Sequence, residues 1–373
     1  MIIGVPKEIK SQEYRVALTP AAAHELHVHG HRVQVETKAG VGCGFEDQDY
    51  RNAGATIALN AASVFDEAEL IVKVKEPQTE ERARLRQGQT LFTYLHLAPD
   101  HQQTQELIDS GATCIAYETV TDAQGRLPLL APMSEVAGRM SIQAGAHCLE
   151  KSQQGRGVLL GGVPGVEPAT VVILGAGVVG SNATQMAVGL GAKVIVLDRS
   201  IDALRVLDGH YRNHIQTVFS TRQSLAHWVR EADLVIGAVL IPGAAAPKLV
   251  SRALLKEMKN GAALVDVAID QGGCFETSRA TTHDDPVYIE ERVVHYCVAN
   301  MPGALARTST QALNNATLPY ILELADNGIK QALSKNTYLL QGLNITHHQL
   351  TCPSVGQAQN RDSITPEQGL KLL

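Results

Sequence analysis

Three glycines in the middle of this 373-residue chain, Gly175, Gly177 and Gly180, form a G-x-G-x-x-G pattern. The pattern directly follows the apolar run 170–174 and opens a helical stretch that begins at Val178. In that context, such glycines allow a tight turn, the approach of a pyrophosphate to the backbone, and close packing of helix against strand. The helix amino terminus adds N–H donors for phosphates. We therefore interpret the segment as a dinucleotide site rather than as a turn without a ligand.

An acidic residue, Asp198, ends the next apolar run, residues 193–197, and lies about twenty residues beyond the glycines. An ionised carboxylate there accepts hydrogen bonds from the ribose hydroxyls of NAD and repels the 2′-phosphate of NADP. Arg199 is next in sequence, and an arginine can pair with that phosphate. The sequence predicts a preference for NAD over NADP, and it predicts that Asp198 rather than Arg199 determines this preference.

Basic residues and one acid follow other apolar runs, or lie in loops beside them. Lys73 and Lys75 lie at the end of the run 70–74, His96 follows the run 91–95, and Asp270 lies past the run 263–267. Ligands bind outside the carboxyl ends of strands in open α/β sheets. We expect Lys75 to belong to a site and Lys73 to be solvated. Asp266, inside its strand, is expected to be structural.

An arginine is suited to binding a carboxylate, and a histidine is suited to transferring a proton. Arg15, in a loop-like stretch after the first strand, has a planar fork that binds a carboxylate through two parallel bonds. A histidine titrates near neutral pH and can move a proton. From position alone, Arg15 is better explained as a solvated surface residue, since arginine is mostly exposed. His96 is equally compatible with a buried histidine bonded to the backbone.

A histidine cluster, His24, His27, His29 and His31, is the other group with possible ligand chemistry. It straddles the end of a predicted helix and the start of a strand, so the four imidazoles do not share one face. No thiol or carboxylate completes a recognised ligand spacing with them. We expect no metal site.

The elements that position these residues alternate between strand and helix. Five apolar runs, 2–5, 32–35, 70–74, 91–95 and 113–117, precede a long helical stretch from Ser134, and the alternation resumes at residue 170. This pattern predicts an α/β protein with two Rossmann-like domains, mostly parallel sheets and a substrate/NAD cleft between them. The expected domains are a discontinuous substrate domain, 1–130 plus 305–373, and an NAD-binding domain, 131–304. The final segment, from about residue 349, shows no clear period.

Composition restricts the class of protein. The net charge is −6 with charges scattered along the chain, so we expect no nucleic-acid partner. No apolar stretch reaches the roughly 18–20 residues that span a bilayer, and the first residues do not form a signal peptide. The 6 cysteines lie far apart, which is typical of reduced thiols in a cytoplasmic protein.

Taken with these motifs, the chain resembles the alanine dehydrogenase family. The resemblance covers roughly residues 1–345 and includes the segments GVPKEIKSQEYRVALTP, IVKVKEP, LHLAPD, MSEVAGRMS, GVPGVEPA, VILGAGVVG, VDVAIDQGG and VANMPGA. It implies a reversible oxidation of L-alanine to pyruvate and ammonium, with NAD as cofactor. The α-carbon gives up a hydride, and water hydrolyses the resulting imine.

The same resemblance assigns roles to residues. Arg15 and Lys75 would bind the substrate, His96 would be the acid–base group, and Asp270 would work with it and touch the nicotinamide ribose. It also implies a homo-oligomer, a hexamer. Further cofactor contacts carried over from the family are Ser134, Ser220, Val239, Leu240, Val267, Arg279, Asn300 and Met301.

Other functions share parts of this pattern. An NAD-binding subunit of a transhydrogenase would not turn over an amino acid, and that family lacks the substrate lysine and has Glu in place of Asp270. A non-enzymatic NAD-binding protein would have no need of Arg15, Lys75, His96 and Asp270 together. A dehydrogenase of another amino acid, such as saccharopine, differs in pocket volume, which one sequence does not give.

Overall fold

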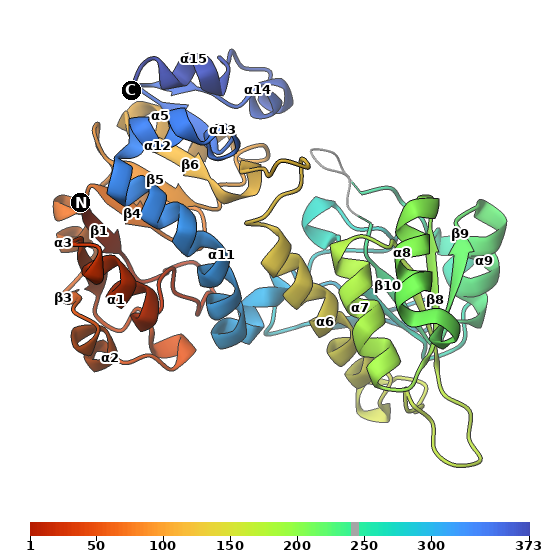
Figure 1. Cartoon of the computed structure of the whole chain (residues 1–373). Coiled ribbons are helices and arrows are strands. Elements are labelled where there is room, and N and C mark those ends of the chain that lie inside the picture. Colours follow the sequence, from red (N-terminus) through yellow and green to blue (C-terminus); the bar gives the residue numbers. More distant parts are fainter. Residues whose placement is uncertain (240–245) are drawn as a thin grey trace. The chain divides into compact units, whose positions relative to one another are not determined.

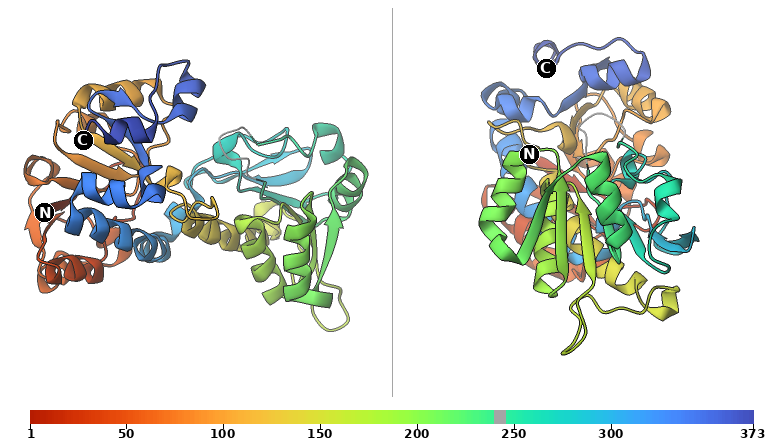
Figure 2. Two further views of the ribbon diagram at one scale, coloured as in Figure 1. Left: turned by 45° about the horizontal axis from the view of Figure 1, so that its top comes forward. Right: turned by 90° about the vertical axis from the view of Figure 1, so that its right-hand side faces the viewer.

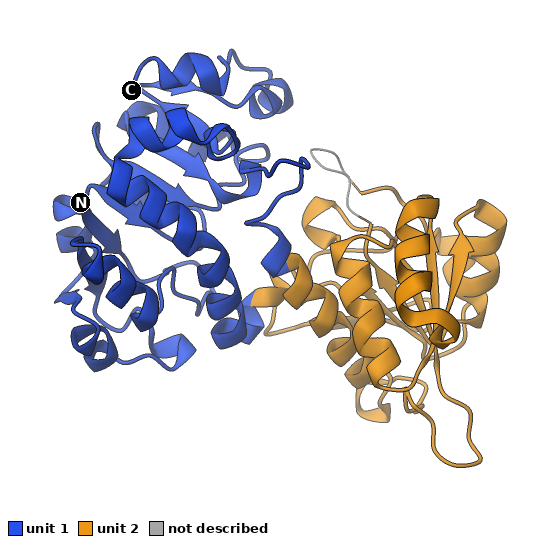
Figure 3. Cartoon of the chain, viewed as in Figure 1, with its two compact units in different colours: residues 1–133, 303–373 blue, residues 134–302 orange. Residues whose placement is uncertain are grey.

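The computed structural model describes residues 1–239 and 246–373 of the chain (Figure 1). The chain forms two compact units, and the first is discontinuous in sequence (Figure 3). Unit 1 consists of Met1–Met133 and Gly303–Leu373, and unit 2 of Ser134–Pro302. Helix α6 (Ala131–Cys148) starts at the end of the first segment and continues into unit 2. The α/β class predicted from the alternating pattern is confirmed.

Unit 1 contains an eight-stranded sheet with the order β15-β14-β6-β5-β4-β1-β2-β3. From β3 to β6 all strands are parallel, and β14 and β15 extend the sheet in antiparallel fashion. The parallel part has the 3-2-1-4-5-6 order of doubly wound sheets, which reverses between β1 and β4. The strands are β1 (Ile2–Val5), β2 (Arg32–Glu36), β3 (Thr56–Ala58), β4 (Leu70–Val72), β5 (Thr90–Thr93), β6 (Thr113–Ala116), β14 (Leu343–Thr346) and β15 (Gln349–Leu350).

Helices cover the unit 1 sheet and begin where the sequence offers a cap. Helix α1 starts at Pro20, with the Thr19 hydroxyl accepting from the Ala22 N–H at 3.2 Å, as residues of these types predict. The helices are α1 (Pro20–Val28), η1 (Val41–Cys43), α2 (Asp47–Asn52), α3 (Ala61–Glu67), α4 (Thr79–Arg82), α5 (His101–Ser110), η2 (Tyr117–Thr119), η6 (Met301–Leu305), α11 (Ala306–Asn327), α12 (Ile329–Lys335), α13 (Thr337–Leu340), α14 (Pro353–Gln359) and α15 (Pro366–Leu370).

The carboxyl-terminal segment has more structure than its sequence pattern suggests. Strand β15 pairs with β14, and the short helices α14 and α15 follow it (Figure 1). Leu350, Cys352 and Val355 join the apolar cluster that contains Ile71 and Leu91 from β4 and β5. The segment is therefore part of the unit 1 core. Its elements are too short to show a period of their own.

Unit 2 contains a seven-stranded sheet with the order β12-β13-β11-β10-β7-β8-β9. All pairs are parallel except β12 with β13, so this sheet also has the 3-2-1-4-5-6 order, with its reversal between β7 and β10. The strands are β7 (Thr170–Leu174), β8 (Lys193–Asp198), β9 (Ile215–Phe219), β10 (Leu234–Gly237), β11 (Ala263–Asp266), β12 (Val287–Glu290) and β13 (Val293–Tyr296).

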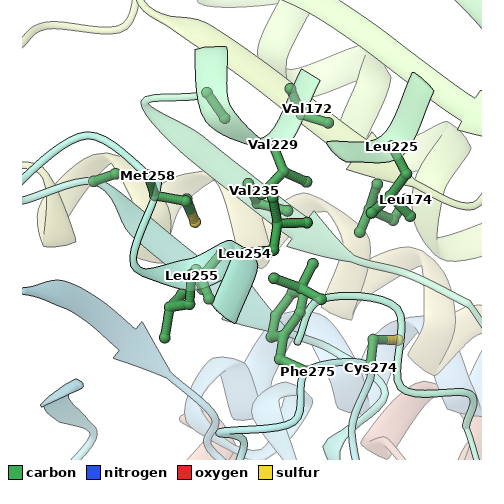
Figure 4. Packing of buried hydrophobic residues seen from close by; sticks show 14 of the residues in the cluster. Val172, Leu174, Leu225, Val229, Val235, Leu254, Leu255, Met258, Cys274 and Phe275 are labelled. Atoms are coloured by element: carbon green, nitrogen blue, oxygen red, sulfur yellow. The ribbon is translucent and has the colours of Figure 1, made fainter. Parts of the chain in front are cut away.

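Helices lie on both faces of the unit 2 sheet (Figure 2). A cluster of buried side chains fills the space under α9 and α10, including Val172 and Val235 from the strands, Val229 and Leu255 from the helices, and Phe275 (Figure 4). Strands β7, β10 and β11 are buried along their whole length, which accounts for their continuous apolar sequence. The helices are η3 (Lys151–Gln153), α7 (Val178–Gly189), α8 (Ile201–Tyr211), η4 (Arg212–His214), α9 (Arg222–Glu231), α10 (Arg252–Leu255) and η5 (Ile269–Gln271).

Candidate active site

Two positions of the turn between β7 and α7, Gly175 and Gly180, have no room for a Cβ atom. Gly175 has a φ of +109°, and a Cβ there would lie 2.7 Å from the Ala238 carbonyl oxygen. A Cβ on Gly180 would lie 1.8 Å from the Gly175 carbonyl oxygen, so helix and turn are in direct contact. A Cβ on Gly177 would meet nothing within 4 Å, which leaves open space at the helix amino terminus. This arrangement fits a pyrophosphate.

The carboxylate of Asp198 is fixed beside this turn at the end of β8. Its Oδ2 accepts from the Ala176 N–H at 2.6 Å and its Oδ1 from the Ser200 N–H at 2.7 Å. Ser220, which follows β9, donates its N–H to the Asp198 carbonyl at 2.9 Å. Two backbone bonds therefore orient a half-buried carboxylate at the place where a ribose would follow the pyrophosphate.

Val239 follows β10 at the point where the strand order reverses. Its N atom would lie 3.2 Å from a Cβ on Gly175, so the carboxyl ends of β7 and β10 are close together. Val267 follows β11 and donates its N–H to the Gly237 carbonyl at 3.0 Å. In doubly wound sheets the ligand crevice opens at this reversal. Leu240, also predicted to contact the cofactor, lies outside the described residues.

The loop after β11 carries Asp270, and Asp266 shapes that loop. Asp266 is fully buried, and its carboxylate accepts from the Ala268 N–H at 3.1 Å, the Cys274 N–H at 2.8 Å and the Ser278 hydroxyl at 2.5 Å. Burial raises the pKa of Asp266, and these hydrogen bonds oppose the rise. Asp266 is thus structural, whereas Asp270, in η5, is exposed.

The other cofactor residues predicted by resemblance also belong to unit 2. Ser134 lies in the first turns of α6 and is half-buried. Arg279 is exposed, with its guanidinium over the ring of Tyr288. Asn300 has a φ of +61°, and Met301 is 3% exposed at the start of η6.

In unit 1, Arg15 is buried in the loop after β1 and held by Glu13. Its Nε lies 2.6 Å from Glu13 Oε1 and its Nη2 2.5 Å from Oε2, while Nη1 lies 3.1 Å from Met133 Sδ. Burial opposes the charge of the guanidinium, but the hydrogen bonds and charge of Glu13 outweigh it and raise the pKa of Arg15. A solvated surface arginine, which position alone allowed, is therefore excluded, since the side chain is 2% exposed.

The expectation that Lys73 is solvated is wrong. Its Nζ is fully buried, 3.0 Å from Glu8 Oε2 and 2.7 Å from Glu81 Oε1. Burial alone would lower the pKa of Lys73, but the two carboxylates outweigh it and raise the pKa. Lys73 directly follows β4, whose residues are buried on both faces of the sheet, so its side chain enters the interior whichever face it lies on. Lys75 is half-buried beyond the strand end, and Glu8 Oε1 accepts the N–H of Val74 at 2.7 Å.

His96 lies after β5 in a left-handed backbone conformation, with a φ of +50° and an exposed side chain. Its N–H donates to Glu118 Oε1 at 2.6 Å, and the N–H of Leu95 donates to the same carboxylate at 3.1 Å. The imidazole is stacked on Tyr94, with centroids 5.7 Å apart and planes 13° apart. Non-glycine residues with positive φ are enriched at functional sites, where surrounding bonds hold them.

The structure adds residues that sequence reasoning missed, namely Glu13, Tyr94 and Glu118. The Tyr94 hydroxyl donates to the Leu129 carbonyl oxygen at 2.5 Å. Burial raises the pKa of Tyr94, and the nearby charge of Arg15 partly opposes the rise. Tyr94 therefore lies near both Arg15 and His96. Its position near the end of the apolar run 91–95, two residues before His96, was a usable signal. Glu118 follows β6, and its proximity to His96 could be predicted only from the order of the strands in the sheet.

Two members of the histidine cluster, His29 and His31, contact one carboxylate in the structure. His29 Nδ1 lies 3.0 Å and His31 Nε2 2.7 Å from the Asp326 carboxylate of α11, and neither pair involves the site at the strand ends. No group of three or more side chains able to hold a metal occurs among residues 1–239 and 246–373. Within the same ranges, no helix is both long enough and apolar enough to cross a membrane.

Two doubly wound units define a dinucleotide-dependent enzyme class, because one has a glycine turn with an acid at the end of the next strand and the other has basic residues at its strand ends. Residues 4–137 match the family model "Alanine dehydrogenase/PNT, N-terminal domain", and residues 141–353 match "Alanine dehydrogenase/PNT, C-terminal domain". The chain belongs to the alanine dehydrogenase/PNT family.

Known proteins similar to this chain include an alanine dehydrogenase from Halomonas elongata, 62% identical over 96% of this chain and 96% of the relative. A solved L-alanine dehydrogenase is 51% identical with a TM-score of 0.94, covering 96% of this chain and 99% of that one. A transhydrogenase structure from Sinorhizobium meliloti is 24% identical with a TM-score of 0.81, covering 95% of this chain and all of that one. This last similarity concerns the fold alone.

Proposed function

We propose that this protein is an NAD-dependent enzyme that oxidises L-alanine to pyruvate and ammonium and catalyses the reverse reaction when ammonium is abundant. The observation that carries this proposal is near-full-length similarity, at 51–62% identity, to proteins named alanine dehydrogenase. The residues at the strand ends supply what the reaction needs: basic groups, an imidazole and an exposed carboxylate. At 24% identity, the transhydrogenase is not favoured as a functional match.

Binding of the substrate falls to Arg15 and Lys75 in this proposal. An α-amino acid carries a carboxylate at neutral pH, and a buried guanidinium binds that group strongly because little water competes. Glu13 orients the guanidinium through two bonds and balances its charge while the site is empty of substrate. Lys75, half-buried after β4, adds a second cation for the carboxylate or for the carbonyl oxygen of pyruvate.

Proton movement falls to His96 and Asp270. The imidazole of His96 takes the proton released when water adds to the imine and returns it to the leaving ammonia. Glu118 accepts the backbone N–H of His96, and the Tyr94 ring stacks against its imidazole. Asp270, exposed on η5, provides a carboxylate for proton transfer and for the ribose next to the nicotinamide.

The cofactor residues of unit 2 fit NAD. When bound, NAD would supply the acceptor for the hydride of the substrate α-carbon. Gly175, Gly177 and Gly180 leave room for its pyrophosphate, and Asp198, held by the Ala176 N–H, would accept hydrogen bonds from its ribose hydroxyls. We assign the cofactor to unit 2 and the substrate to unit 1, because the glycine turn is in the former and Arg15 in the latter.

The test is an assay of NADH formation with a panel of amino acids, together with NADH consumption by pyruvate plus ammonium. We expect L-alanine to give the highest kcat/KM in the forward direction and pyruvate in the reverse. Turnover of saccharopine or glutamate without turnover of alanine would contradict the substrate assignment. Binding of NADH with no amino acid oxidised would favour a transhydrogenase-like subunit.

Arg15→Lys is expected to raise the KM for pyruvate by roughly tenfold or more, because an ammonium cannot form the paired bonds of the guanidinium fork. The dissociation constant of NADH should stay within about twofold of the unaltered value. Steady-state kinetics and a fluorescence titration of NADH measure the two quantities. An unchanged KM would remove Arg15 from substrate binding. Arg205→Lys, at an exposed position on α8, is the matched control.

We further propose a homo-oligomer, a hexamer, in the cytoplasm. The basis is the family to which the chain belongs and the six scattered, buried cysteines, none of which is paired in the structure. Sedimentation equilibrium of the purified protein is expected to give a multiple of the 40.0 kDa chain mass. A single species at the monomer mass would contradict it.

A further inference from the structure

Arg279 is exposed, yet its side chain and its backbone are both fixed by one neighbour. Its Cζ lies 3.9 Å from the centre of the Tyr288 ring, within the range of a cation–π contact. Its backbone N–H donates to the Tyr288 hydroxyl oxygen at 3.0 Å. A long charged side chain at the surface usually samples many rotamers, so this double contact is a specific feature.

Tyr288 is itself held on all sides. It is 9% exposed on β12 and lies directly opposite His295 of β13, so the two side chains share one face of the sheet. Their rings stack, with centroids 4.8 Å apart and planes 24° apart. The Tyr288 hydroxyl donates to the Thr277 carbonyl at 2.9 Å. The ring therefore forms a rigid platform under the guanidinium.

His295 completes the platform as a neutral ring. Its Nδ1 lies 3.0 Å from the Val293 carbonyl oxygen and therefore carries a hydrogen, and its Nε2 lies 2.8 Å from the Thr277 hydroxyl oxygen. Burial is the main cause that lowers the pKa of His295. A neutral imidazole places no positive charge behind Tyr288. The negative face of the Tyr288 ring thus remains available to Arg279.

The loop that carries Arg279 follows β11 and is anchored at a second point. Asp266 accepts from the Ser278 hydroxyl, one residue before Arg279, and from the Cys274 N–H. The loop thus follows the carboxyl end of β11, the edge at which ligands bind in doubly wound sheets. A planar guanidinium there is suited to a phosphate oxygen pair.

We propose that Tyr288, supported by His295, is a positioning residue that presents Arg279 to a phosphate of the dinucleotide. The inference rests on the proposed NAD function and deepens it. Preorganisation of this kind lowers the entropy that binding would otherwise cost, since Arg279 does not have to be ordered by the ligand. Tyr288 does not touch the cofactor in this proposal and acts only through Arg279.

A double-mutant cycle on NADH binding tests this proposal in the full-length protein, with Arg279→Ala, Tyr288→Leu and the combined variant. Arg279→Ala is expected to weaken NADH binding by roughly tenfold or more, the loss of a charge-assisted bond. Tyr288→Leu should weaken it by about three- to tenfold, and Tyr288→Phe, which keeps the ring, by less. In the Arg279→Ala background, Tyr288→Leu should cause no further loss.

Two results would overturn the proposal. If Tyr288→Leu weakens binding by the same factor in both backgrounds, Tyr288 acts on the fold rather than through Arg279. If Arg279→Ala leaves NADH binding unchanged, the guanidinium does not meet the cofactor. ADP-ribose and adenosine serve as further probes, and the effect of Arg279→Ala must appear only with the first. Oxidation of alanine by the unaltered enzyme is measured separately. Absence of that activity would contradict the proposed function, whereas the binding cycle tests only the role of Tyr288. Tyr211→Phe on α8 is the matched control.

Discussion

Replacement of His96 is expected to lower kcat for alanine oxidation by about 10²-fold or more, the usual share of a positioned acid or base. His96→Asn is the sharper variant, because asparagine tolerates the left-handed φ of +50° that the chain adopts there, whereas alanine adds backbone strain. His96→Ala should therefore show the same loss of kcat together with reduced thermal stability. Asp270→Asn, which preserves shape and removes the charge, is expected to cost a similar factor.

Initial-rate kinetics measure these losses, and a fluorescence titration shows whether NADH still binds. His96→Asn and Asp270→Asn should both bind NADH and unfold cooperatively on heating, since His96 and Asp270 are exposed and outside the cores. His24→Ala and Asp208→Asn, at exposed positions on α1 and α8, are the matched controls. Near-normal turnover by either His96→Asn or Asp270→Asn would remove that residue from the mechanism.

The second large effect concerns the choice of cofactor. We expect the unaltered enzyme to prefer NAD over NADP by roughly 10²-fold or more in kcat/KM, because two like charges a few ångströms apart repel strongly at a partly desolvated site. The Asp198 carboxylate is held at the glycine turn by the Ala176 and Ser200 N–H groups, so it cannot swing away from a 2′-phosphate. Asp198→Ala should lower the ratio of kcat/KM with NAD to kcat/KM with NADP, because NADP is then no longer repelled.

Kinetics with both cofactors for the unaltered enzyme, Asp198→Ala and Arg199→Ala distinguish the two neighbours. Arg199 is exposed, so its removal should change the ratio little. Asp208→Ala serves as the control on the same unit. Comparable kcat/KM values with NAD and NADP in the unaltered enzyme would show that Arg199, not Asp198, governs this part of the site.

Much of unit 2 could be predicted from sequence because its signals are local. The G-x-G-x-x-G pattern, the strands around it and Asp198 occupy one continuous stretch, and the steric demands of the turn act on neighbouring residues. The apolar runs predicted as strands in the first 130 residues are all present as β1, β2, β4, β5 and β6. Strand β3 has three residues, as β4 does, but only its last residue is buried, and β15 has two residues with one buried. Neither β3 nor β15 therefore shows a readable apolar run.

The sequence by itself determined which residue types stand at the strand ends, because side-chain alternation and the end of an apolar run are properties of adjacent residues. Only the tertiary structure decided which of them are paired. Lys73 and Lys75 are two residues apart, yet only Lys73 is fully buried. Its ammonium group is paired there with Glu8 and Glu81, which come from other parts of the chain. Glu118 reaches the backbone of His96 because β5 and β6 are neighbours. Charges of this kind are stable in the interior only when distant partners meet them, and strand order, not spacing, brings those partners together.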